Sequence, residues 1–298
     1  MSPIHNAVMG PWFSSATILV TLALLSFLYV RSWGRLQRVS ASALPHWRLV
    51  SFLLGLSLVW AALGSPLAAY DHVLLTVHMI QHLLLMTFAP ALILLGEPLL
   101  VFWHGLPRFA QPLGDQVLRR PLAQRFGRVL SQPALCWIVS TSTLMGWHIP
   151  ALFAWGMHSE VWHSIEQASF LGAGFLFWLP VIQPWPSVSK GEQWAILLYL
   201  FLATLPCDVL SGFLVFSGGV AYPLYFSMPR HFGFSVLEDQ QCAAALMWTC
   251  VTLVYLVPAA ILSTRLLSPR SFYRGDLVQS ELPSSAASLE HPQSLETL

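Results

Sequence analysis

Long apolar stretches alternate with short polar connections along most of the chain. Seven stretches reach about 20 residues, the length that an α-helix needs to cross a bilayer core of roughly 30 Å. They lie near residues 14–32, 49–69, 73–96, 133–151, 160–182, 193–217 and 239–263. A helix satisfies its backbone polar groups internally even in lipid, so the pattern predicts an all-α, polytopic bundle of seven transmembrane helices.

The remaining segments are polar. The first apolar stretch has no basic residue before it, so we interpret it as a retained helix and not as a cleaved signal peptide. Residues 104–132 form a basic connection, in which we expect a short amphipathic helix over 115–130. From Asp276 onward the chain lacks hydrophobic periodicity, which predicts disorder. The expected organisation is a transmembrane domain over 1–275 and a disordered cytoplasmic tail over 276–298.

Composition narrows the class of protein. Of the 298 residues, 56% are hydrophobic and 9% are charged, whereas a soluble domain carries about 25% charged residues. This excludes an ordinary soluble enzyme, a disordered protein and a nucleic-acid binder, and a net charge of +1 offers no field to attract a polyanion. The four cysteines show no CxxC spacing, so neither a disulfide framework nor a zinc site is expected.

Basic residues predict the orientation. Of the 14 lysines and arginines, Arg230 alone falls on one side of the predicted bundle. The others fall on the opposite side: Arg31, Arg35, Arg38, Arg48, Arg108, Arg119, Arg120, Arg125, Arg128, Lys190, Arg265, Arg270 and Arg274. Cytoplasmic loops of membrane proteins carry the excess of Lys and Arg. We therefore expect the N-terminus outside and the C-terminus in the cytoplasm.

The third stretch, 73–96, carries two histidines four residues apart, His78 and His82. At this spacing both imidazoles project from one helix face, and Met86 continues that face by another turn. Imidazole suits either copper state and a thioether favours Cu(I), so these side chains are candidate copper ligands. Histidines hydrogen-bonded to neighbouring helices would give the same pattern, and the sequence favours neither interpretation. Pro90 should bend the helix below the pair.

Other polar side chains fall in the same, predicted outer half of the bundle. His148 ends the fourth stretch, and His163 and Glu166 lie three residues apart on one face of the fifth. Asp208 follows Pro206, which we expect to interrupt the sixth stretch. Ionisable groups within a membrane are costly and are usually paired or functional. Each also has a structural interpretation: interfacial hydrogen bonding for His148, a helix–helix clamp for His163 and Glu166, and a bond to a neighbouring histidine for Asp208.

Six segments together resemble the CtaG-type, seven-helix assembly factors of bacterial cytochrome c oxidase. They are HMIQHLLLMTFAPALILLGEP (78–98), GWHIPALF (146–153), HSIEQASFLGAGFLFWLPV (163–181), LPCDVLSGFLVFSG (205–218), YPLYF (222–226) and LEDQQCAAALMW (237–248). The six segments cover most of stretches three to seven and follow the order that they have in the family. Together they are specific to this family.

The resemblance implies a role in maturing haem–copper oxidases in the bacterial cell (inner) membrane. The expected cargo is copper, and the expected partners are oxidase subunits, an extracytoplasmic or periplasmic copper chaperone and membrane lipid, with no nucleic acid. The polar positions shared with the family are His78, His82, His148, His163, Glu166, Asp239 and Gln240.

The leading hypothesis is that the outer half of the bundle binds copper and passes it to an oxidase subunit. His78 and His82 would be ligands, with His148, His163 and Met86 as further candidates. The polar set that would support or orient the imidazoles is Glu166, Asp208, Asp239 and Gln240. No nucleophile is paired with a base, so we expect no enzyme. A haem-binding electron carrier and a metal-free assembly scaffold are the alternatives, although His78 and His82 share one helix and lie too close together to bracket a haem.

Overall fold

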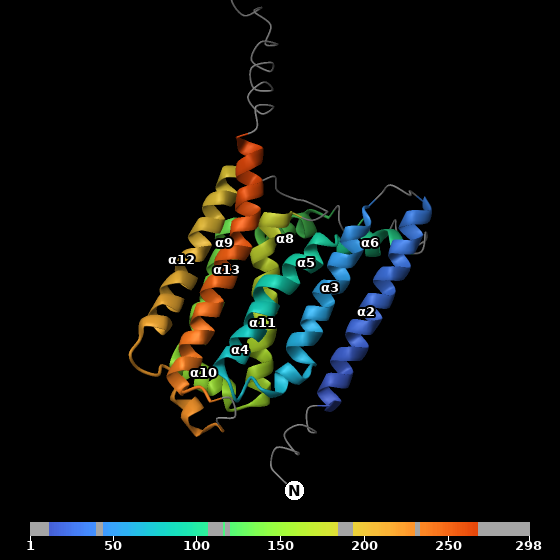
Figure 1. Ribbon diagram of the computed structural model, residues 1–298. Coiled ribbons are helices and arrows are strands. Elements are labelled where there is room, and N and C mark those ends of the chain that lie inside the picture. The colour runs from blue at the N-terminus through green and yellow to red at the C-terminus, as the bar shows by residue number, and fades with distance from the viewer. Residues whose placement is uncertain are drawn as a thin grey trace, which may run out of the picture.

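The computed structural model describes residues 12–39, 44–106, 116, 120–183, 193–229 and 233–267, and within these ranges all regular structure is helical (Figure 1). The helices are α2 (Trp12–Val39), α3 (His46–Leu63), η1 (Pro66–Ala69), α4 (Leu75–Leu83), η2 (Leu84–Phe88), α5 (Ala89–Leu95), α6 (Pro98–Gly105), α8 (Pro121–Leu130), α9 (Pro133–Trp147), α10 (Pro150–Met157), α11 (Glu160–Ile182), α12 (Gln193–Phe216), η3 (Pro223–Ser227) and α13 (Val236–Leu266).

Six helical segments of the described chain are long and apolar enough to cross a membrane. They are Ala16–Arg38, His46–Ala69, Leu75–Leu95, Glu160–Ile182, Gln193–Phe216 and Val236–Leu266. Six of the seven predicted stretches therefore form helices with the length and composition of a multi-pass membrane protein. The side of the membrane on which each connection lies stays a prediction.

The fourth predicted stretch, 133–151, folds differently from the others. It forms α9, which has 15 residues and ends at Trp147, and a second helix, α10, begins at Pro150. Ile149 precedes this proline and adopts the extended conformation that such a position favours. Because α9 alone is about 22 Å long, shorter than a bilayer core, the seventh crossing stays a prediction.

The segment that carries the paired histidines lies in the middle of the bundle. Figure 1 shows α2 and α12 at opposite edges, with α4, α5 and α11 between them. In the most apolar part of Leu75–Leu95, 61% of the residues are buried within the protein, against 17% for Ala16–Arg38. Helix α4 packs against α13, and α5 packs against α3 and α11. Polar groups on α4 are therefore enclosed by protein.

Two prolines affect their helices in different ways. Before Pro90 the helix widens into the π-helical turn η2, which fits the expected distortion because a proline removes one helical hydrogen bond and crowds the preceding turn. The interruption expected at Pro206 is wrong: α12 is continuous through it. Helices in membranes tolerate an internal proline when neighbouring groups satisfy the freed carbonyl.

The polar connections are described in part. Helix α8 is exposed and carries Arg125 and Arg128. It confirms the helix expected over 115–130 from Pro121 onward. Residues 268–298, including the predicted tail, lie outside the described residues, as do Lys190 and Arg230.

Candidate metal site

Two histidines of α4 and one glutamate of α11 converge in the interior of the bundle. The Nε2 atoms of His78 and His82 each lie 3.5 Å from Oε1 of Glu166. The two imidazole rings are 4.2 Å apart, and the side chains are 0%, 7% and 0% exposed in the order His78, His82, Glu166. We call these three residues the inner triad. The predicted common face of the histidine pair is confirmed.

Helix packing brings Glu166 to the histidines. Helix α11 packs against η2 and α5, and a Cβ on Gly174 would lie 2.5 Å from the carbonyl oxygen of Met86. The two backbones can approach this closely only because residue 174 has no side chain. Glu166 is eight residues earlier, about two turns along the helix, which places its carboxylate beside the α4 imidazoles.

The inner triad is unusual because its polar atoms are not hydrogen-bonded. Both ring nitrogens of His78 and His82 and both carboxylate oxygens of Glu166 are buried and have no hydrogen-bond partner among the described residues. Buried polar atoms nearly always have a hydrogen-bond partner, and a missing partner lowers the stability of the fold. A separation of 3.5 Å is too long for a charge-assisted hydrogen bond. Two ligand atoms that share a tetrahedral ion, with bonds of about 2.1 Å, lie about 3.4 Å apart.

A second cluster lies beside the first, toward the protein surface. The Oδ2 atom of Asp71 lies 3.5 Å from Nε2 of His163, and its Oδ1 atom lies 3.7 Å from Nε2 of His72. We call Asp71, His72 and His163 the outer triad. Burial raises the pKa of Asp71, and the imidazole of His72 opposes this shift. His163, which the sequence predicts as a metal ligand, lies in the outer triad. Its ring also stacks on the ring of His78, with 5.7 Å between the centroids.

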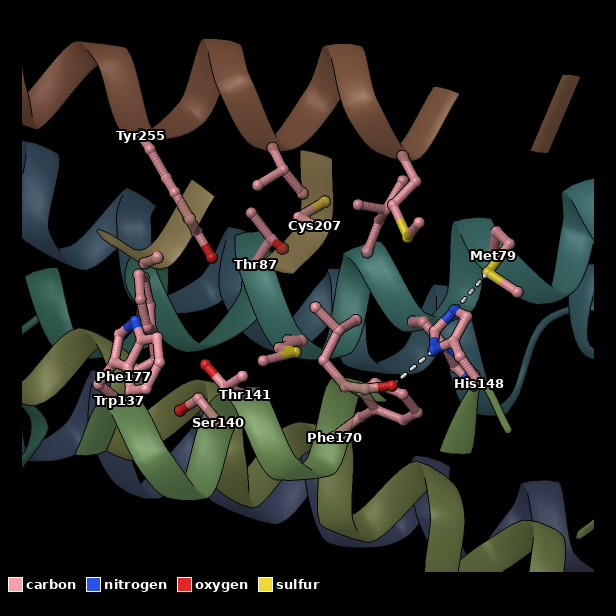
Figure 2. A pocket seen from close by; sticks show the side chains of 17 residues that line it. Met79, Thr87, Trp137, Ser140, Thr141, His148, Phe170, Phe177, Cys207 and Tyr255 are labelled. Atoms are coloured by element: carbon pink, nitrogen blue, oxygen red, sulfur yellow. Dashed lines mark hydrogen bonds between the residues drawn. The ribbon is translucent and has the colours of Figure 1, made fainter. Parts of the chain in front are cut away.

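His148 faces a thioether. Its Nδ1 lies 2.7 Å from the carbonyl oxygen of Leu144, to which it donates, and its Nε2 lies 3.4 Å from the sulfur of Met79 (Figure 2). An imidazole protonated on Nδ1 keeps a free lone pair on Nε2. The His148 ring is 6.2 Å from that of His82. His148 and Met79 thus offer a nitrogen and a sulfur beside the inner triad.

The same side chains border a small cavity inside the bundle. Its volume is about 40 Å³, enough for a few water molecules. Figure 2 shows its lining extending from His148 and Phe170 to Trp137 and Tyr255. The sulfur-bearing side chains in the lining are Met79, Met86, Cys207 and Met247. Met86 lines this cavity together with His82, and the π-helical turn η2 begins between them at Leu84. The role of Met86 as a copper ligand stays a prediction.

Asp239 and Gln240 have a different role from the expected one of orienting imidazoles. The Asp239 carboxylate accepts hydrogen bonds from the backbone N–H groups of Leu75 and Thr76, at 2.9 and 3.1 Å, and so caps α4. The Gln240 side chain accepts from the N–H of Ala221 and donates to backbone carbonyls of the connection that follows α12. Both hold the fold around the site. Asp208 is half-buried on α12 and lies in neither triad.

Sequence reasoning missed three members of this region: Asp71, His72 and Met79. Asp71 and His72 precede the predicted third stretch, so the four-residue spacing within that stretch does not include them. The signal that could have found them is the run of three histidines and one aspartate within twelve residues, from Asp71 to His82. Met79 faces His148 only because two distant segments meet, and no spacing along the chain indicates that contact.

The fold and the site define a class: a helical protein with membrane-spanning helices and a buried cluster of imidazoles and carboxylates. Residues 27–268 match the family described as the cytochrome c oxidase caa3 assembly factor (Caa3_CtaG), and the chain belongs to this family. The resemblance seen in the sequence is thereby confirmed.

Relatives of this chain occur in mycobacteria. Uncharacterized proteins of Mycobacterium bovis and Mycobacterium tuberculosis are each 24% identical over 268 residues, which cover 88% of this chain and 40% of the relative. One from Mycobacterium leprae is 24% identical over 251 residues, 83% of this chain and 38% of the relative. The chain thus spans about two fifths of the length of these relatives. No solved structure matches it.

Proposed function

We propose that this assembly factor holds copper in the inner triad and passes it to a cytochrome c oxidase subunit in the bacterial cell membrane. The family description supplies the oxidase as the assembly target. The observation that carries the copper role is the convergence of two imidazoles and a carboxylate, all buried and without hydrogen bonds. Such a cluster is unfavourable as packing alone and suits a cation.

The donor atoms fit copper as cargo. Imidazole nitrogen suits both copper states, and the Glu166 carboxylate would supply the negative charge that a buried cation needs. Met79 and Met86 line the same cavity as His148 and His82, and the Met79 sulfur lies 3.4 Å from Nε2 of His148. Thioethers favour Cu(I). Transfer of copper to an oxidase subunit requires ligands that can be exchanged for those of the subunit. In this proposal His148 and His163 are neighbouring ligands, and Glu166 binds the ion directly.

The predicted orientation supports delivery from the outer side. Both triads lie at the end of the bundle opposite the basic connections, and the positive-inside rule assigns the basic connections to the cytoplasm. Copper would then be held at the depth of the outer leaflet, within protein, and handed laterally to a buried oxidase centre. The ion would not cross hydrocarbon without ligands.

Metal analysis of the purified protein tests the proposal. The double variant His78→Ala/His82→Ala should lose at least about tenfold in copper affinity, since two ligands are removed. His158→Ala is the matched control, because His158 is an exposed histidine at the same end of the bundle. Equal copper affinity in the double variant and the wild type would remove the pair from the site.

The alternatives give different results in simple measurements. A wild-type protein that takes up no copper, and whose deletion is not rescued by added copper, would favour a metal-free scaffold. A Soret band in the absorption spectrum would favour haem. Oxidase activity restored by added copper in the deletion strain supports copper delivery.

A further inference from the structure

The outer triad is less isolated than the inner triad, because Nε2 of His163 lies within hydrogen-bonding distance of the Gln167 amide, at 3.4 Å. It too contains a buried polar atom without a partner, and it reaches solvent. Asp71 is 1% exposed, and its Oδ1 atom has no hydrogen-bond partner among the described residues. The His72 side chain beside it is 45% exposed. The buried carboxylate of Asp71 and the imidazole of His72 are not hydrogen-bonded to each other. The carboxylate is favoured by a nearby cation, and the exposed imidazole gives a cation access to it from solvent.

Distances in the outer triad match a shared ion better than an ion pair. The separations from Asp71 to His163 and His72 are 3.5 and 3.7 Å, whereas a charge-assisted hydrogen bond is about 2.7–2.9 Å long. One ligand atom from each of the three residues lies within 4.8 Å of the others. An ion at their centre would draw the three together only slightly.

The position of Asp71 is fixed from outside the triad. The Tyr225 hydroxyl, on η3, donates to the backbone carbonyl oxygen of Asp71 at 3.0 Å. Tyr222, next to η3, donates in the same way to the carbonyl oxygen of His148, also at 3.0 Å. The connection between α12 and α13 therefore holds one residue of the outer triad and one neighbour of the inner triad at fixed places.

The two triads are adjacent. The His163 ring stacks on the His78 ring with 5.7 Å between centroids and 20° between planes, and the His72 ring is 5.0 Å from that of His163. Exposure of the side chains falls along this series, from 45% at His72 to 10% at His163 and 0% at His78. The series runs from the surface to the inner triad without a gap.

We propose that Asp71, His72 and His163 form a second metal site, which captures copper at the surface and passes it to the inner triad. The proposal rests on the copper role of the inner triad. Transfer is a ligand exchange in which the ion keeps its oxidation state. A bond to His78 forms as a bond to His72 or Asp71 breaks, and His163 stays near the ion throughout.

The test measures copper uptake by the full-length protein in detergent, with copper(I) supplied as its bicinchoninate complex. In His72→Ala and in Asp71→Asn, the rate of uptake should fall about tenfold, while the final occupancy of the inner triad changes less than about twofold. His72 is exposed, so its truncation should not disturb folding. His158→Ala should take up copper at the wild-type rate.

A second arm isolates the outer site. The variant His78→Ala/His82→Ala should keep weak copper binding, which is lost when His72→Ala is added. Uptake by His72→Ala and Asp71→Asn at the wild-type rate would overturn the outer site and leave the inner one intact. Failure of the proposed function is distinct: the wild type would take up no copper, or His78→Ala/His82→Ala would bind it as tightly as the wild type does.

Discussion

Two groups of buried polar residues lie within a few turns of each other in this protein. One group is hydrogen-bonded to its surroundings and the other is not. Asp239 and Gln240 on α13 are 3% and 1% exposed, and their side chains bond to backbone groups of neighbouring segments. His78, His82 and Glu166 are as deeply buried, but their polar atoms have no hydrogen-bond partner among the described residues.

The difference separates residues that stabilise the bundle from residues placed for a ligand. A buried polar side chain that bonds to backbone groups repays its desolvation and fixes two segments relative to one another. A buried cluster without such bonds lowers stability unless something binds it. The first group therefore belongs to the fold, and the second is the candidate site. Substitutions can test this distinction, because the two groups should respond oppositely.

The largest effect on stability is expected for Asp239→Ala. The substitution leaves the N–H groups of Leu75 and Thr76 without their acceptor, which should lower the free energy of unfolding by about 2–4 kcal/mol. Thermal unfolding in detergent measures the change. Cys242→Ala is the control, since Cys242 is exposed on the same helix. A melting temperature as high as that of the control would show that Asp239 does not stabilise α4.

Glu166→Gln should give the opposite pattern. No hydrogen bond of the described protein is lost, because neither carboxylate oxygen of Glu166 has a partner among the described residues. The free energy of unfolding without metal should therefore change by less than about 1 kcal/mol, while copper affinity falls at least about tenfold. Glu160→Gln, at the exposed start of α11, should change neither quantity. If Glu166→Gln instead destabilises the protein and binds copper normally, the carboxylate serves packing.

A smaller effect is expected for Gly156→Ala on α10. The added Cβ would lie 3.1 Å from Oε2 of Glu166, closer than ordinary contact, so the carboxylate must shift slightly. Copper affinity should fall by about twofold to fivefold, which is less than about 1 kcal/mol. Gly172→Ala is the control, because a Cβ there meets no atom within 4 Å. Equal affinities for the two variants would mean that the position of the carboxylate is not critical.

Much of this arrangement follows from local rules of sequence. The apolar stretches predict the helices, and the four-residue spacing of His78 and His82 predicts their common face, because both depend on helix geometry alone. The distortion expected at Pro90 takes the form of a π-helical turn over Leu84–Phe88, which contains Met86. The sequence predicts that the helix is distorted there and does not specify this form.

The rest depends on contacts between distant segments. Glu166 was expected to support an imidazole, and it lies between two of them because Gly174 lets α11 approach η2. Asp239 was expected to do the same, and it caps α4 instead. Spacing along one helix cannot distinguish these outcomes, since the partner of a buried carboxylate is chosen by helix packing.

X-ray absorption of the copper-loaded protein tests the central claim most directly. The account predicts a copper shell with at least two imidazole nitrogens and a carboxylate oxygen, and a loss of imidazole scattering in His78→Ala/His82→Ala. A shell made only of sulfur, or one unchanged by that double substitution, would contradict the assignment of copper to His78, His82 and Glu166.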